Sequence, residues 1–529
     1  MTDSAASRHI HIPHWTQRWG IGGFLVIILV GAVYSITSLT SDLVESPSGN
    51  LLVFLLLGVA LLIALGFEFV NGFHDTANAV ATVIYTHSLP AYVAVVWSGM
   101  FNFLGVLLSS GAVAFGIISL LPVELILQVG SHAGFAMVFA LLIAAIIWNL
   151  GTWYLGLPSS SSHTLIGSII GVGLMNQMMA SGNSGTSGVD WNQALGIGKS
   201  LLFSPLIGFF AAAVLLLICK AVIRIPALYQ APKGHQPPPL WIRGVLILTC
   251  TGVSFAHGSN DGQKGMGLIM LILIGTVPTA YALNHSVGRD QVEVFVADSA
   301  RAVAALEAHG GTMPLTGEPR RILTTTVEKR APQAETVPAL AKMIADISAS
   351  VAGYGTLAAV PTASTANVRN DMYLISETLA MLKRKGSLNL TAPEQADMDR
   401  YKKGIDNATK FIPTWVKVAV AIALGLGTMV GWKRIVVTVG EKIGKTHMTY
   451  AQGASAELVA MATIGAADVY GLPVSTTHVL SSGVAGTMAA NRSGLQMSTV
   501  RNLLAAWVLT LPASIALAGG LFWLFRHLI

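Results

Sequence analysis

Two polar sequence patterns each occur twice in this chain, and every copy lies in strongly apolar sequence. The first reads NGFHDTANAVA at 71–81 and HGSNDGQKGMG at 257–267. The second reads GLPSSSSHTLIG at 156–167 and GLPVSTTHVLSSG at 471–483. The same order in both halves indicates an internal repeat. Paired polar motifs at membrane depth are typical of transporters built from two repeats around a central site.

The composition places the chain in a membrane. Hydrophobic residues make up 53% of it and charged residues only 11%, with a mean hydropathy of +0.64. A soluble chain carries roughly a quarter charged residues, whereas the apolar runs here match bilayer spans of about 20 residues. We therefore expect an all-α polytopic membrane protein. The net charge of +6 indicates basic cytoplasmic loops rather than nucleic-acid binding. Cys219 and Cys250 lie in apolar runs without metal-ligand spacing, and we expect them to be inert.

Length and motif positions predict six segments. They are an N-terminal extension with one extra transmembrane helix (1–49), repeat 1 (50–224), a Pro-rich cytoplasmic linker (225–240), the first part of repeat 2 (241–284), a soluble cytoplasmic insert (285–411) and the second part of repeat 2 (412–529). The apolar run at 21–40 is longer than the core of a signal peptide and no cleavage pattern follows it, so we expect a retained span. A cleaved signal is the alternative.

Broken helices and hairpins are predicted at corresponding places in the two halves. The apolar run at 76–87 is too short to cross a bilayer, which suggests a broken helix continuing from 51–70. The segments 157–180 and 473–490 are rich in glycine and hydroxyl residues and favour re-entrant hairpins. The expected fold is two inverted-topology repeats with broken helices and re-entrant hairpins, plus a small helical soluble insert.

The insert holds most of the charge clusters. Periodic segments at 338–353 and 372–385 predict two or three amphipathic helices. A solvated domain without transport chemistry and a regulatory or partner-docking domain are both open.

Basic residues in short loops predict the orientation. Lys220, Arg224, Lys233 and Arg243 flank the linker and place it in the cytoplasm. Five crossings per repeat then put the first 20 residues and the insert in the cytoplasm and the C-terminus outside. The same count puts 433–447 outside, although this segment carries four basic residues.

The hydroxyl clusters predict an anion site. Each follows a Gly-Leu-Pro turn, and proline begins a helix well. Helix N-termini with hydroxyl donors bind tetrahedral oxyanions. The expected substrate-binding hydroxyl residues are Ser160, Ser161, Ser162, Thr164, Ser475, Thr476 and Thr477. Small residues that permit close helix packing are the alternative explanation, but the shared GLPxSxxH pattern favours a site.

Acidic residues in membrane segments predict a coupling-ion site, because ionisable groups there are costly. Asp75 and Asp261 align, and a carboxylate beside an anion site is expected to hold a proton or cation. Glu68 and Glu457 are either further coupling acids or members of structural buried pairs. Asn78, Asn260 and Lys264 are expected to contact substrate, and Lys264 has a structural ion pair as its alternative role.

Histidines accompany both motifs. His163 and His478 hold equivalent positions, and we expect them, with His74 and Asn149, to be structural or gating residues. Titration in a proton-coupled cycle is the other possibility for histidine.

These motifs, together with WNLGTWYLGLPSSSSHTLIG, resemble the duplicated signatures of the inorganic phosphate transporter (PiT) family, and the bacterial low-affinity Pit branch in particular. The resemblance covers about 50–527. It implies a secondary transporter in the bacterial inner membrane that imports phosphate by alternating access. Proton symport and uptake of a neutral divalent metal–phosphate complex, for instance with Mg²⁺, are associated with this branch. Sodium symport is the alternative, but Asn102 stands where some sodium-coupled members carry glutamate.

The resemblance implies no enzyme activity and no fixed metal or cofactor. Arsenate is expected as a substrate analogue, the bilayer is the expected surrounding, and a homo-oligomer is possible. Two rival functions remain open: a passive anion channel, and an intramembrane hydrolase using Ser161 or Ser162 with His163 or His478. Adjacent Ser and His on one turn rarely give productive nucleophile–base geometry, which weighs against the hydrolase.

Overall fold

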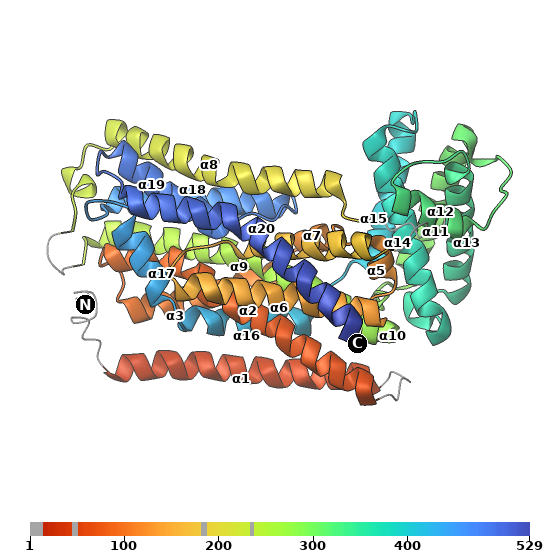
Figure 1. Cartoon of the computed structure of the whole chain (residues 1–529), viewed down its shortest axis with the longest axis horizontal. Coiled ribbons are helices and arrows are strands. Elements are labelled where there is room, and N and C mark those ends of the chain that lie inside the picture. Colours follow the sequence, from red (N-terminus) through yellow and green to blue (C-terminus); the bar gives the residue numbers. More distant parts are fainter. Residues whose placement is uncertain (1–13, 45–50, 181–187, 233–236, 529) are drawn as a thin grey trace.

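The computed structural model describes residues 14–44, 51–180, 188–232 and 237–528, apart from the side chains of 14–21, 24, 51–52 and 75–78. The described chain forms a bundle of long helices with a compact helical domain at one end (Figure 1). The prediction of an all-α membrane protein is confirmed.

Seven helices in the described ranges are long and apolar enough to cross a membrane. They are α1 (His14–Val44), α2 (Leu51–Tyr85), α3 (Ala91–Leu108), α6 (His132–Tyr154), α8 (Trp191–Val222), α9 (Leu240–Thr276) and α20 (Met497–Leu528). Large apolar side chains on α8, such as Phe210 and Val214, are exposed. In water such a surface would be unfavourable, whereas in a bilayer it faces lipid.

The remaining helices of the bundle are shorter. They are α4 (Ala112–Ile118), α5 (Val123–Leu127), α7 (Ser161–Met179), α10 (Pro278–Tyr281), α16 (Thr414–Met429), α17 (Lys433–Val437), α18 (Tyr450–Val469) and α19 (Thr476–Ala490), with single turns at Pro226–Tyr229 and Thr438–Lys442. The predicted hairpin segments correspond to α7 packed on α6 and α19 packed on α18. Gly156 and Gly471 have positive φ angles of 67° and 64°, which only glycine adopts without strain, and each opens the Gly-Leu-Pro turn before its helix.

The prediction of broken helices at the first motif pair is wrong. α2 runs without a break through 71–81, and α9 is one helix of 37 residues through 257–267. The described α9 contains no proline that would interrupt it. Its glycines serve close packing instead: a Cβ at Gly258 would overlap the Asn102 carbonyl of α3, and one at Gly105 of α3 would overlap the Phe255 carbonyl of α9.

The insert is a bundle of five α-helices with its own apolar core. They are α11 (Arg289–Leu306), α12 (Pro319–Lys329), α13 (Thr336–Tyr354), α14 (Thr362–Lys385) and α15 (Ala392–Thr409), with short turns at Glu307–Gly311 and Leu357–Ala359. The expectation of two or three helices was too low. On α15 only a narrow stripe (Met398, Tyr401, Ile405, Ala408 and Thr409) is buried, and the charges around it hide the helical period in the sequence.

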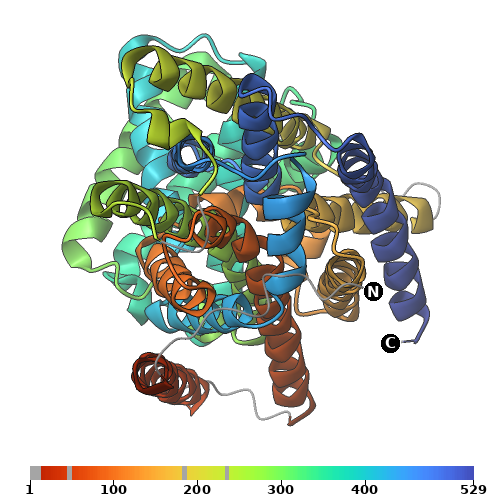
Figure 2. The same ribbon diagram turned by 90° about the vertical axis from the view of Figure 1, so that its left-hand side faces the viewer.

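The linker and the insert lie at opposite ends of the bundle (Figure 1). Figure 2 views the molecule from the linker end, with the insert behind the long helices. The predictions that both lie in the cytoplasm therefore cannot both hold. The segment 433–447, which did not fit the predicted topology, lies at the linker end: Tyr85 donates to Glu441 at 2.7 Å, and Arg243 donates to the Ser88 carbonyl at 2.7 Å. The crossing count from the sequence was wrong there.

Candidate functional site

The N-termini of α7 and α19 face each other inside the bundle. Ser160 caps α7 by accepting from the His163 backbone N–H at 3.2 Å, and Ser475 caps α19 by accepting from the His478 backbone N–H at 3.1 Å. The two histidine rings lie 4.7 Å apart between centroids. From this meeting point α7 runs toward the insert and α19 toward the linker end (Figure 1). Two positive helix ends thus converge on one place.

An ion pair on α9 joins the two helix ends. Lys264 Nζ lies 2.7 Å from Asp261 Oδ1 and 3.4 Å from Ser161 Oγ in the first turn of α7. Asp261 Oδ2 accepts from Thr476 Oγ1, in the first turn of α19, at 3.2 Å. Both charged side chains are fully buried. The structure therefore brings together Lys264, Asp261, Ser161 and Thr476, which the sequence assigned to the site from three separate segments.

His257 extends this cluster. Its Nε2 lies 3.3 Å from Asp261 Oδ2, and its Nδ1 lies 2.6 Å from Asn102 Oδ1 on α3. Sequence reasoning did not select His257, although its spacing of four residues from Asp261 places both on one helix face. The partner Asn102 follows from the packing of α3 on α9 and carries no local signal.

Asn260 and Gln263 hold the second Gly-Leu-Pro turn in place. Asn260 donates to the Leu472 carbonyl at 3.2 Å. Gln263 donates to Asp468 at 2.6 Å and accepts from the Val113 backbone N–H of α4 at 2.9 Å. Asn260, predicted to contact substrate, is therefore in a position to fix the turn that presents α19.

The first-half residues form a related network. His74 Nε2 lies 3.2 Å from Thr152 Oγ1 of α6, and Thr164 donates to Asn149 Oδ1 of the same helix at 3.0 Å. His74 and Asn149 thus connect α2 and α7 through α6. The side chains of Asp75 and Asn78 lie outside the described residues.

The two other acids occupy different places. The Glu68 carboxylate on α2 packs against Gly265 and interacts electrostatically with Lys264, so it belongs to the central cluster. Glu457 on α18 accepts hydrogen bonds from Thr82 and Thr249. Thr249 precedes Asp261 by twelve residues on α9, about 18 Å along a helix. Glu457 is therefore separate from the cluster.

Ser162 and Trp507 connect the two Gly-Leu-Pro turns. Ser162 donates to the Val474 carbonyl at 2.6 Å. Trp507 of α20 stacks on His478, with centroids 4.1 Å apart, and donates to the Pro158 carbonyl at 3.2 Å. Thr477 is fully buried beside them. Trp507 was not predicted, because nothing in its local sequence distinguishes it from an aromatic residue at the membrane interface.

The cluster can bind an anion away from water. It combines hydroxyl groups, two helix N-termini and one ammonium group with a carboxylate that this ammonium neutralises. Each selected residue of the two hydroxyl clusters is at most 8% exposed, as are Asp261 and Lys264. A ligand can therefore reach or leave the site only after helices move.

Comparisons with known proteins show the family of this chain. Residues 71–518 match the model of the phosphate transporter family. The chain is 44% identical over 488 residues to the low-affinity inorganic phosphate transporter PitA of Escherichia coli K12, covering 89% of this chain and 96% of PitA. It is 42% identical to PitB of the same strain, covering 90% and 97%. It is 28% identical to a probable low-affinity inorganic phosphate transporter of Bacillus subtilis, covering 86% and 93%.

One solved structure, a sodium-dependent phosphate transporter, is 19% identical with a TM-score of 0.49, covering 90% of this chain and all of that one. The match to the family model and the PitA and PitB similarities extend over most of the sequence, and the family match at 71–518 includes all four motif copies. These relatives are transporters, so the hydrolase alternative is not retained. The chain is a multi-pass membrane protein that belongs to the phosphate transporter family.

Proposed function

We propose that this chain imports inorganic phosphate across the plasma membrane by proton symport through alternating access. The observation that carries the proposal is the convergence of the α7 and α19 N-termini on the buried Lys264–Asp261 pair. The relatives named as inorganic phosphate transporters support phosphate as the anion. A channel would need a continuous open path, whereas this cluster is buried.

Phosphate binds between Ser161 and Thr476. Each hydroxyl lies in the first turn of its helix, where backbone N–H groups also point toward the anion. Lys264 already contacts Ser161, so its ammonium moves little to reach a phosphate oxygen there. Charge-assisted hydrogen bonds of this kind are about twice as strong as neutral ones.

Protons couple the transport. The Lys264 ammonium group lies 2.7 Å from the Asp261 carboxylate, where it takes the place that a metal cation would otherwise fill. Glu68, Asp75 and Asp261 are the acids proposed to take up and release the proton, and Glu457 is set aside because of its distance. Sodium symport is the alternative within the same family.

The substrate enters as a neutral complex of phosphate with Mg²⁺ or another divalent cation. Burying a bare divalent anion is costly, and a bound cation offsets that cost. Arsenate has the same shape and charge as phosphate and is expected to compete.

Alternation arises from two inverted repeats that move against each other. The opposite directions of α7 and α19 around one site support this arrangement (Figure 1). A rocking motion that opens the site toward the C-terminal end of α7 would close it toward that of α19.

The linker end faces the cytoplasm and the insert faces outward. Nine basic residues of the described chain lie in the segments of the linker end: Lys220, Arg224, Arg243, Lys433, Arg434, Lys442, Lys445, Arg492 and Arg501. The short segments at the insert end, 109–131 and 180–190, contain neither lysine nor arginine. This asymmetry supports the orientation, since long domains such as the insert translocate regardless of their charge.

Uptake of labelled phosphate into proteoliposomes tests the proposal. An inward proton gradient without sodium is expected to drive accumulation, and Mg²⁺ is expected to raise the rate. Strict dependence of uptake on sodium would show that sodium, and not the proton, is the coupling ion. Flux that never exceeds equilibrium under either gradient would contradict symport.

A further inference from the structure

One buried arginine of the insert has no acidic partner. Arg369 on α14 is 6% exposed, and its Nε has no hydrogen-bond partner. Its contacts are a hydrogen bond to Asn370 Oδ1 at 3.1 Å and a cation–π contact with Tyr373 at 5.2 Å. Among the described side chains no carboxylate pairs with it. A buried guanidinium group without a counter-ion is unfavourable unless an anion joins it.

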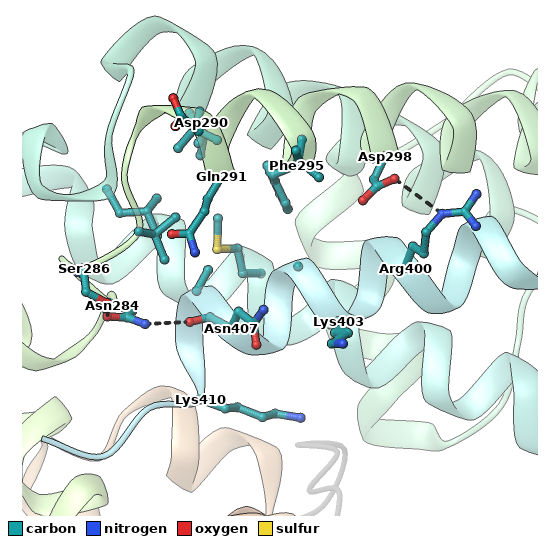
Figure 3. A pocket seen from close by; sticks show the side chains of 18 residues that line it. Asn284, Ser286, Asp290, Gln291, Phe295, Asp298, Arg400, Lys403, Asn407 and Lys410 are labelled. Carbon is teal, nitrogen blue, oxygen red and sulfur yellow. Dashed lines mark hydrogen bonds and ion pairs between the residues drawn. The ribbon is translucent and has the colours of Figure 1, made fainter. Parts of the chain in front are cut away.

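Arg369 lines a small cavity between the insert and the transport helices. This cavity of about 40 Å³ adjoins one of about 330 Å³, and Phe115, Ser119, Glu377 and Lys410 line both. Lys410 also lines a third cavity of about 620 Å³ inside the insert, where Figure 3 shows it apart from the other labelled residues and next to a ribbon of the transport helices. The three spaces therefore meet at Lys410.

Two carboxylates that line the cavity of about 330 Å³, Asp406 and Asp190, each form ion pairs with two basic side chains. Asp406 is paired with both Lys402 and Lys410, at 2.6 and 2.9 Å. Asp190, at the start of α8, is paired with both Arg330 and Arg384.

Glu377 is the third acid at the junction, and burial raises its pKa, which reduces its negative charge. Four cations (Arg369, Arg384, Lys402 and Lys410) and three acids (Asp190, Glu377 and Asp406) line the two junction cavities, so the cations outnumber the acids and the junction favours an anion.

Helix α4 is the wall between these cavities and the central site. Phe115 and Ser119 line the cavities, whereas the Val113 backbone N–H binds Gln263, two residues from Asp261. Gln193, which also lines the larger cavity, donates to the Gly116 carbonyl of α4 at 3.2 Å. A ligand held at this junction thus contacts the same helix that bonds to Gln263 beside the central site.

We propose that the junction of the insert with the transport helices is a second anion site, which binds a phosphate group through Arg369, Lys410, Arg384 and Lys402. The inference rests on the proposed function, for which it supplies an external binding site. Inorganic phosphate binds there first and enters the central site after α4 moves. The headgroup of an anionic phospholipid has the same chemistry and is the other possible source of the phosphate group.

Uptake of labelled phosphate by the full chain in proteoliposomes tests this site. Arg369→Gln and Lys410→Gln are expected to raise the KM by about tenfold with an unchanged maximal rate, because a cationic site concentrates substrate locally. Lys383→Gln is the matched control, since Lys383 is next to Arg384 but pairs with the exposed Asp399 and lines neither junction cavity. Arg369→Lys keeps the charge and is expected to retain a near wild-type KM.

Two lipid compositions distinguish the sources. If free phosphate occupies the site, the KM changes are the same in phosphatidylcholine vesicles with and without phosphatidylglycerol. If a headgroup occupies it, omitting phosphatidylglycerol lowers the wild-type rate and the variants no longer differ from wild type. A wild-type KM in both Arg369→Gln and Lys410→Gln, in vesicles with and without phosphatidylglycerol alike, overturns the second site.

Binding of labelled phosphate to the purified chain separates this inference from the proposed function. If wild type fails to accumulate phosphate under any gradient, the proposed function fails, and the binding comparison still decides the site. Weaker binding by Lys410→Gln than by Lys383→Gln supports the site, and equal binding of both phosphate and phosphatidylglycerol by these two variants overturns it. Lys410→Gln also decides the question if Arg369→Gln does not fold.

Discussion

At the residue scale, the site depends on opposite charges that are buried together. Asp261 and Lys264 are both fully buried, and Glu68 and His257 complete the surroundings of the pair. A buried pair adds little net stability, but losing one partner leaves an uncompensated charge. The pair is therefore better explained by function than by stability.

Lys264→Met is expected to destabilise the protein by about 3–5 kcal/mol, because the Asp261 carboxylate then lacks its counter-ion. The double variant Lys264→Met/Asp261→Asn is expected to regain most of that stability and still not transport. Unfolding in detergent and uptake in vesicles measure the two effects. Equal destabilisation of the single and double variants would show that the pair is not coupled.

Ser161→Ala is expected to raise the KM for phosphate. Losing a hydrogen bond to a charged group costs about 1.5–3 kcal/mol, which is about tenfold or more in affinity. Ser168→Ala is the control, since Ser168 is equally buried on α7 but bonds to the Thr164 carbonyl of its own helix. Similar KM values for the two variants would remove Ser161 from the site.

At the element scale, the sequence predicted the hairpins but not the unbroken helices. The Gly-Leu-Pro turns and capping serines have local signals, and α7 and α19 begin where those signals place them. The polar motifs of α2 and α9 were expected to break their helices. Whether a glycine breaks a helix or admits a neighbour depends on tertiary packing, which one sequence does not reveal. The contacts of Asn102 and Trp507 were hidden for the same reason.

Gly258→Ala is expected to disrupt the crossing of α3 and α9, because its Cβ would overlap the Asn102 carbonyl. Overpacking of this kind costs about 1–3 kcal/mol or more. Gly244→Ala is the matched control on the same helix, where a Cβ meets no atom within 4 Å. Thermal unfolding in detergent measures the midpoint temperature of both variants. A midpoint for Gly258→Ala as high as that of Gly244→Ala would contradict the close packing of α3 on α9.

At the scale of the whole molecule, the orientation follows from which segments share an end. The sequence supplied the basic residues, but the crossing count that grouped them failed because it let the chain cross twice between 241 and 284, whereas α9 is one helix there and crosses once. Once the structure groups 220–243 with 433–447, the basic segments agree with one another. The insert then belongs to the opposite face.

Thiol labelling of intact cells tests this orientation. In a background without Cys219 and Cys250, Ser387→Cys on the exposed surface of the insert is expected to react with an impermeant maleimide. Gln230→Cys, on the exposed surface of the linker, is expected to react only after the membrane is permeabilised. The reverse pattern would show the opposite orientation in the membrane. The junction cavities would then lie on the cytoplasmic side, where phosphate leaves the transporter.

The central claim is that a tetrahedral anion binds where the two helix N-termini meet. Anomalous diffraction from crystals grown with arsenate tests it most directly, because arsenic marks the position of the anion without ambiguity. We predict a peak between Ser161 and Thr476, beside Lys264. A peak confined to other parts of the molecule, with this cluster empty at saturating arsenate, would contradict the account.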